Sequence, residues 1–115
     1  MNTIELLKKA REVITDPDHW VQRRYGETKD GKILCAASMV EAYKVCAVGA
    51  LYKAISNKLD HYETVLEAKN ELTKGIDSHE EEKYKNLQIT DFNDQTSHGE
   101  VLALFDATIE RLEEK

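Results

Sequence analysis

The sequence predicts a mainly α-helical domain with a minor β component, in which about four helices surround a central apolar helix. Three observations support this prediction. Capping residues stand three positions before a glutamate at nearly every expected helix start. Apolar residues recur at helical spacing in the first and last segments, and one segment between them has β-prone residues around Asp30-Gly31. With 115 residues, the chain is expected to form a single domain, residues 1–115.

Helix starts are marked by a capping box, in which a side chain accepts from a free backbone N–H and a glutamate three residues later reaches back. The pairs are Asn2 with Glu5, Ser38 with Glu41, Asp60 with Glu63, Ser78 with Glu81, and Ser97 with Glu100. They predict helices over residues 3–14, 39–55, 61–74 and 98–114, with a short one over 79–86. Pro17 is expected to end the first helix.

Residues 39–55 are apolar on almost every side, which predicts a central helix with neighbours all around it. Gly49 lies within it and lowers helix propensity by about 1 kcal/mol relative to alanine. We expect that another backbone approaches closely there, between the small Ala47 and Ala50.

Two segments lack a helical pattern. Residues 20–36 have β-prone ends around Asp30-Gly31, which predicts a small β-hairpin. The stretch LQITDFND, residues 87–94, is interpreted as extended, either a third short strand or a buried connector.

The formal net charge of −6 makes direct binding to nucleic acid unfavourable. The same acidity suits a protein that docks on a basic surface, including one that normally holds nucleic acid. No run approaches the roughly 20 apolar residues of a membrane span, and the N-terminus is unlike a signal peptide, so we expect a cytoplasmic protein. Cys35 and Cys46 are then expected to be reduced thiols, and their spacing excludes a CxxC motif.

Two motifs resemble those of a known family. VCAVGALYKA contains a Cys-Ala-x-Gly-Ala-Leu helix motif, and ITDFNDQTSHGEVLALFD contains Asp-Phe-Asn-Asp followed by His-x-Glu-Val-Leu. Together they resemble a family of small uncharacterised proteins from bacteria and their phages. The sequence departs from the family pattern at Val45, where the family prefers tryptophan, and in a shorter spacer before His98. The resemblance implies membership and a shared fold but no particular activity.

Catalytic candidates are Cys46, His98 and either Asn93 or Asp94, because a thiol needs a base and the base needs an orienting group. The alternative is structural. A cysteine three turns inside an apolar helix is an inert core residue. His98, in the first turn of the last helix, is expected to be neutral and to brace the Asn93–Asp94 loop, which itself satisfies backbone groups before that helix.

A second candidate surface contains Trp20, Arg23, Arg24 and Tyr25. Aromatic and arginine side chains are common anchors of protein interfaces, and they also stack on and pair with nucleotides. A binding site would combine them with Asn93, Asp94 and His98. The alternative is that Trp20 covers the core and the arginines are solvated. No metal site and no cofactor are predicted, since EF-hand and zinc-ligand spacings are missing.

These observations favour a binding protein over an enzyme. The preferred function is a small acidic accessory protein of a phage or mobile element, which binds a protein partner in the host cytoplasm. Inhibition of a defence or nucleic-acid enzyme is one such role. The alternatives are a small-ligand protein that sequesters nucleotides and a Cys-His hydrolase. The sequence leaves a homo-oligomer open.

Overall fold

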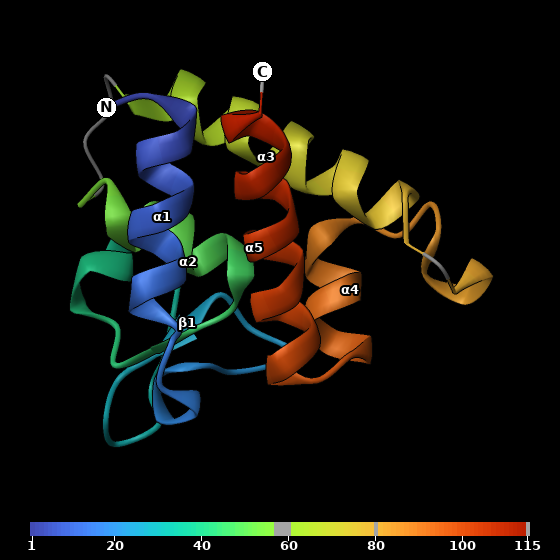
Figure 1. The fold of residues 1–115 in the computed structure, drawn as a ribbon. Helices are drawn as coiled ribbons and strands as arrows, with labels where there is room; N and C mark the ends of the chain where they lie inside the picture. The colour runs from blue at the N-terminus through green and yellow to red at the C-terminus, as the bar shows by residue number, and fades with distance from the viewer. Residues whose placement is uncertain (57–60, 80, 115) are drawn as a thin grey trace.

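The computed structural model describes residues 1–56, 61–79 and 81–114 (Figure 1). These residues are mainly helical and carry a small antiparallel sheet, which confirms the predicted fold class. The α-helices are α1 (Thr3–Val13), α2 (Ala47–Ala54), α3 (Tyr62–Asp77), α4 (Ile89–Gln95) and α5 (His98–Glu113). The 3-10 helices are η1 (Pro17–His19), η2 (Ala36–Glu41) and η4 (Glu82–Tyr84), and the strands are β1 (Gly26–Glu27), β2 (Ile33–Leu34) and β3 (Lys44–Val45).

The N-cap half of the capping box is confirmed for the first and last helices, whereas Glu5 accepts from the Asn2 side chain and Glu100 contacts His79 instead of reaching back to a cap N–H. Asn2 Oδ1 accepts from the Glu5 backbone N–H at 2.9 Å, and Asn2 Nδ2 donates to Glu5 Oε1 at 2.9 Å. At α5, Ser97 Oγ accepts from the Glu100 N–H at 3.2 Å. The box at Ser78 is wrong, because Ser78 ends α3 and its hydroxyl donates back into that helix. The box at Asp60 begins outside the described residues.

The predicted helix over residues 39–55 is wrong in its first half. Residues 36–41 form η2, in which Ser38 is an internal residue, and β3 follows before α2 begins at Ala47. The chain is extended at residues 44–45 because these residues pair with β1. A continuous apolar run does not distinguish a buried helix from a buried strand followed by a helix.

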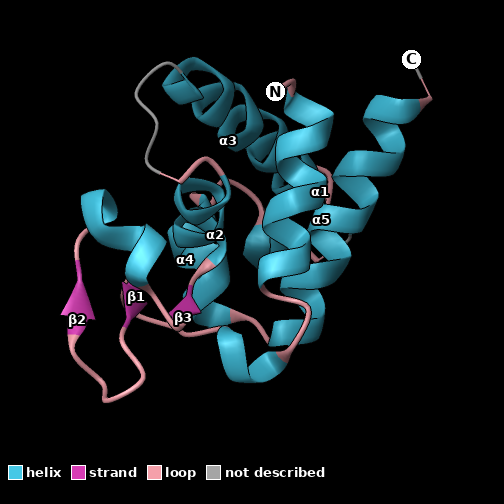
Figure 2. Cartoon of the chain, turned by 90° about the vertical axis from the view of Figure 1, so that its left-hand side faces the viewer, coloured by secondary structure: helices cyan, strands magenta, loops and turns pink. Residues whose placement is uncertain are grey.

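The predicted hairpin is confirmed by β1 and β2, which pair antiparallel with Gly26 opposite Leu34. Gly31 adopts a φ of +90° in the turn, a conformation that favours glycine. The sheet has the order β2-β1-β3, so β1 lies in its centre (Figure 2). Trp20 also forms an isolated bridge to Val45, which ties the segment before the hairpin to the same sheet.

Residues 87–94 are not extended as predicted, since most of them belong to α4. The buried residues of this helix are Ile89, Phe92 and Asn93. Their spacing of three and four places them on one face of a helix, which packs on the core.

The central position of α2 is confirmed, because it packs against α1, α3, α4 and η2. Its buried residues include Val48, Ala50 and Leu51. A β-carbon at Gly49 would overlap the carbonyl oxygen of Tyr25, so the expected close approach of a second backbone is also confirmed. Among the described residues, no helix has both the length and the hydropathy to span a membrane.

Candidate functional site

Asn93 is the centre of a buried polar corner. Its side chain is fully buried, and its Oδ1 accepts from Trp20 Nε1 at 2.7 Å and from the Ala47 backbone N–H at 3.0 Å. Its Nδ2 donates to the Val21 carbonyl at 3.1 Å and to Asp94 Oδ1 at 3.2 Å. A carboxamide offers two donors and about two acceptor positions, so every hydrogen-bonding position of Asn93 is used within the fold. Asn93 therefore joins α4, the start of α2 and the segment after η1.

Neighbouring side chains fasten the same segment to α4. Gln22 Nε2 lies 2.8 Å from the Thr96 carbonyl and within 3.2 Å of the carbonyls of Asn93 and Asp94. Asp94 Oδ1 accepts from the Arg23 N–H at 2.7 Å, where Arg23 has a φ of +69°. The side chains of Asn93 and Asp94 thus satisfy the backbone of residues 21–23 rather than the start of α5.

His98 braces α1 rather than the Asn93–Asp94 loop. Its Nε2 lies 2.6 Å from the Ile14 carbonyl oxygen, so Nε2 carries a hydrogen and donates it. Its ring centroid lies 5.6 Å from that of Trp20. The imidazole therefore links the end of α1, the start of α5 and the buried indole.

Cys46 is the N-cap of α2, and not an internal residue three turns into a helix as the sequence suggested. Its thiol is buried, and Sγ accepts from the Gly49 N–H at 3.4 Å. Burial raises the pKa of the Cys46 thiol, although the hydrogen bonds from the Gly49 and Val48 N–H groups act in the opposite direction. The hydrogen bonds of Cys46 and His98 run to Gly49 and Ile14, so the described contacts do not join the thiol to the imidazole.

A small pocket of about 270 Å³ brings several predicted site residues together. We call it the arginine pocket, and it is lined by Arg23, Arg24, Tyr25, Cys46, Thr90 and Asp94. The other predicted residues, Trp20, Asn93 and His98, lie in the polar corner instead. Arg24 has a long contact with Glu27, 3.5 Å from NH1 to Oε1, and its buried Nε has no partner among the described residues. The guanidinium of Arg24 therefore has unused hydrogen-bonding capacity beside the pocket.

Exposed apolar side chains gather near the sheet, in residues 20–45, which we call the β lobe. Tyr25, Ile33, Val40 and Tyr43 expose 42%, 62%, 51% and 37% of their surface. The β lobe also contains five Lys and Arg residues against three Asp and Glu residues, in a chain with a net charge of −6. The acidity of the protein is thus carried by the rest of the chain.

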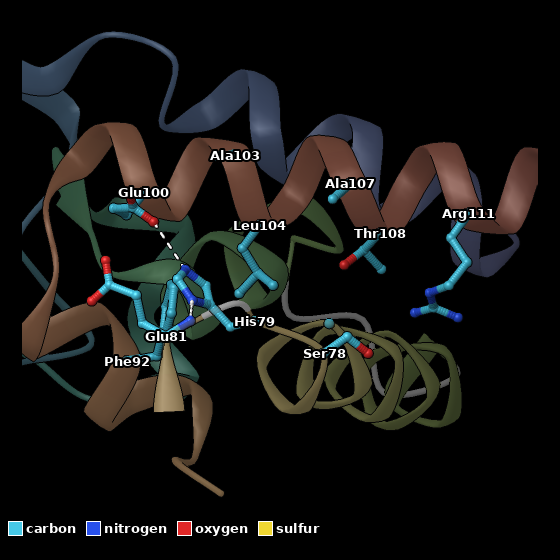
Figure 3. Close-up of a pocket in the computed structure, with 11 residues that line it drawn as sticks. Ser78, His79, Glu81, Phe92, Glu100, Ala103, Leu104, Ala107, Thr108 and Arg111 are labelled. Atoms are coloured by element: carbon cyan, nitrogen blue, oxygen red, sulfur yellow. Dashed lines mark hydrogen bonds and ion pairs between the residues drawn. The ribbon is translucent and has the colours of Figure 1, made fainter. Parts of the chain in front are cut away.

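A larger cleft of about 580 Å³ lies between α5, the C-terminal part of α3 and α4, and sequence reasoning missed it (Figure 3). We call it the α3–α5 cleft. Figure 3 shows Leu104, Thr108 and Arg111 on the side of α5 that faces Ser78 and His79. The signal in the sequence was the i, i+4 spacing of Ala103, Ala107 and Arg111 beside the apolar stripe of α5. Within residues 1–56, 61–79 and 81–114, no group of three or more His, Cys, Asp or Glu residues has an arrangement that holds a metal ion.

Comparison with known proteins identifies the family of the chain without indicating an activity. Neither the curated proteins nor the solved structures contain a match. A family model described as a family of unknown function matches residues 1–111, and thus nearly the whole chain. The two sequence motifs suggested membership of a family without a known activity, and the family match confirms this part of the prediction. The chain belongs to the Family of unknown function (DUF6197).

Proposed function

We propose that the protein acts by binding a protein partner through the β lobe. In this proposal it is a cytoplasmic accessory protein of a phage or another mobile element, and its partner is a host protein such as a defence or nucleic-acid enzyme. The resemblance to bacterial and phage proteins supports the setting. The exposed side chains of the β lobe support the binding function.

The observation that carries the proposal is the combination of exposed apolar side chains and basic residues in one lobe. Ile33 lies on β2, an edge strand, and pairs with Glu27, which in turn pairs with Lys44. Directly paired residues project from the same face of a sheet, so Ile33 and Lys44 share one face. Aromatic and arginine side chains are enriched at protein interfaces. The partner surface favoured by the β lobe is therefore acidic with an apolar centre, which differs from the basic surface that the net charge of the whole chain suggested.

The arginine pocket supplies an anchoring point at the edge of this surface. Arg23 and Tyr25 are exposed and belong to both the pocket and the β lobe. A volume of about 270 Å³ is below the roughly 300–1,000 Å³ of typical small-molecule pockets. It suits one carboxylate-bearing side chain better than a complete nucleotide. This size favours a protein partner over the nucleotide-sequestering alternative.

The hydrolase alternative has less support from the geometry. A catalytic thiol needs a base within hydrogen-bonding distance and a pKa low enough to form thiolate. Burial raises the pKa of the Cys46 thiol, and the imidazole of His98 donates to the Ile14 carbonyl. Both side chains contribute to the packing of the fold, which supports binding over catalysis.

A site-specific photocrosslinker tests the proposal. Replacement of Ile33 by benzoylphenylalanine, in the cells that naturally contain the protein, should yield one dominant covalent adduct, identified by mass spectrometry. Leu66 on α3 is the matched control, because it exposes 58% of its surface against 62% for Ile33. The same label at Leu66 should yield no such adduct.

Charge reversal tests the chemistry of the partner. Arg23→Glu with Lys44→Glu should remove the Ile33 adduct, because an acidic partner would be repelled. The proposal fails if Ile33 and Leu66 labels give the same adducts, or if the double variant crosslinks as well as the wild-type chain. An adduct with a second copy of the chain would replace the proposed partner by a homo-oligomer.

A further inference from the structure

The α3–α5 cleft lies outside the β lobe and takes no part in the proposed partner surface. Its volume of about 580 Å³ falls within the range of small-molecule pockets. Gly75, Ala103 and Ala107 line it with small groups, and Leu104 and Phe92 add larger apolar surface. An apolar body of moderate size therefore fits its middle section.

One end of the cleft presents carboxylates. His79 Nδ1 accepts from the Glu81 N–H at 3.0 Å, so the ring hydrogen on Nε2 faces Glu100 Oε2 at 3.3 Å (Figure 3). This contact holds the Glu100 carboxylate beside the cleft. Glu81 also lines this end, and its described ion pair is an exposed one with Lys83.

At the other end of the cleft, the guanidinium of Arg111 is already hydrogen-bonded to Glu71. Arg111 NH1 donates to Glu71 Oε1 at 2.8 Å, and NH2 donates to the Glu71 carbonyl at 2.9 Å. The guanidinium is therefore engaged by the protein. The carboxylates of Glu81 and Glu100 have capacity for a further donor, so the charge of the cleft favours a cationic ligand.

A buried hydroxyl provides an independent observation. Thr108 exposes 1% of its surface, and its Oγ1 has no hydrogen-bond partner among the described residues. Buried polar atoms without a partner are uncommon in folded proteins. Thr108 projects from the face of α5 that lines the cleft (Figure 3). Rotation about its side-chain bond would present the hydroxyl to a bound molecule.

We propose that the α3–α5 cleft binds a small organic ammonium ion with an apolar body and one further hydrogen-bonding group. The ammonium group lies at Glu100 and Glu81, the apolar body lies against Ala103, Ala107 and Leu104, and the second polar group pairs with the Thr108 hydroxyl. Eight residues separate Glu100 from Thr108 on α5, about 12 Å along the helix axis. A single aromatic ring with a short aminoalkyl chain spans most of this length.

Three probes test the ligand chemistry by protein-observed NMR titration. Tyramine carries the ammonium, the ring and a hydroxyl. Phenethylamine lacks the hydroxyl, and hydroxyphenylpropanoate replaces the ammonium by a carboxylate. We expect saturable shifts at residues of the cleft with tyramine, weaker ones with phenethylamine and none with the carboxylate. Absence of saturable shifts with tyramine, or equal binding of the carboxylate, would overturn the proposal.

Variants separate the cleft from general electrostatic attraction. Glu100→Gln should weaken tyramine binding about tenfold, since a charge-assisted hydrogen bond contributes about 1.4 kcal/mol or more. Glu110→Gln, an exposed position on the same helix outside the cleft, is the matched control and should leave affinity unchanged. Thr108→Val should reduce tyramine affinity to that of phenethylamine. Equal losses in the Glu100 and Glu110 variants would contradict a defined site.

Discussion

The polar corner around Asn93 and the α3–α5 cleft each contain a buried polar side chain, and the two side chains are in opposite states. The Asn93 carboxamide makes four hydrogen bonds within the fold. The Thr108 hydroxyl makes none among the described residues. The first region holds together three segments that are distant in sequence, whereas the second region lies between α3, α4 and α5, whose buried apolar residues belong to the core.

Whether a buried polar group already has a hydrogen-bond partner distinguishes a structural residue from a candidate binding residue more clearly than the type of residue does. Asn, Asp and His residues close in sequence are typical of catalytic sites, but here the Asn93 carboxamide and the Nε2 of His98 are engaged by groups of the fold. A threonine on the apolar face of a helix does not indicate a binding site from the sequence alone. Within the described residues Thr108 nevertheless has a buried hydrogen-bonding group without a partner next to a cleft, as Arg24 has at the arginine pocket. Free hydrogen-bonding capacity at a cavity is the better guide to ligand binding.

The largest expected effect is the loss of the Asn93 carboxamide. Asn93→Ala removes the hydrogen-bond partner of the buried Ala47 N–H and of the partly buried Trp20 Nε1 and Val21 carbonyl. At about 1–3 kcal/mol for each such group, unfolding should become easier by about 3 kcal/mol or more. Urea denaturation measures this change. Gln95→Ala, at an exposed position of α4, is the control and should change stability by less than about 0.5 kcal/mol.

Two glycine substitutions compare the rigidity of the two regions. A β-carbon at Gly49 meets the backbone carbonyl of Tyr25, while one at Gly75 meets side-chain atoms of Leu104 and Thr108. Backbone moves less easily than side chains, so Gly49→Ala should cost about 2 kcal/mol despite its gain in helix propensity. Gly75→Ala should change stability by less than about 1 kcal/mol. Thermal unfolding of both variants tests this order, and a larger loss at Gly75 would reverse the comparison.

Features set by neighbouring residues were predictable from the sequence. The caps at Asn2 and Ser97, the hairpin turn with Gly31 and the fold class depend on local hydrogen bonds and on apolar periodicity. The close approach at Gly49 was also predictable, because a glycine inside an apolar segment has a conformational cost that packing must offset.

Features set by distant residues were not predictable in the same way. Residues 44–45 form a strand because β1 supplies a partner about 17 residues earlier in the chain, and no local signal marks that pairing. The same holds for the hydrogen bonds from Asn93 to Trp20 and Val21, across more than 70 residues. The helix α4 is different, because the spacing of Ile89, Phe92 and Asn93 was a local signal for helix.

The stability of Thr108→Val tests whether the Thr108 hydroxyl in the cleft lacks a hydrogen-bond partner. Valine has nearly the shape of threonine and removes a hydroxyl that has no partner, so the variant should be more stable by about 1 kcal/mol. Thr96→Val is the matched control, because Thr96 Oγ1 donates to the Phe92 carbonyl at 2.7 Å and its loss should destabilise by about 1 kcal/mol. Equal changes in the two variants, measured by urea denaturation, would mean that the Thr108 hydroxyl has a partner in solution.

The smallest expected effect concerns Glu71, which engages Arg111 at one end of the cleft. Hydrogen bonds from Arg111 and Lys74 lower the pKa of the Glu71 carboxyl below its ordinary value. The charged carboxylate therefore stabilises the folded state above the unfolded pKa of about 4.3, and this contribution is lost as the pH falls through the lower folded pKa. Solvent screening limits it to about 0.5 kcal/mol.

Glu71→Gln should accordingly reduce the unfolding free energy slightly at pH 7, and the difference from the wild-type chain should shrink as the pH is lowered toward 3. Urea denaturation across this range measures the trend, and Arg111→Gln serves as a background that removes the hydrogen bond with the largest effect on the Glu71 pKa. In that background, Glu71→Gln should have a weaker pH dependence. A difference between Glu71→Gln and wild type that stays constant from pH 7 to pH 3 would assign the effect to packing instead. The hydrogen bond from Arg111 to the Glu71 carbonyl would then be the remaining support for the claim that this guanidinium is engaged, which would weaken the charge argument for a cationic ligand in the cleft.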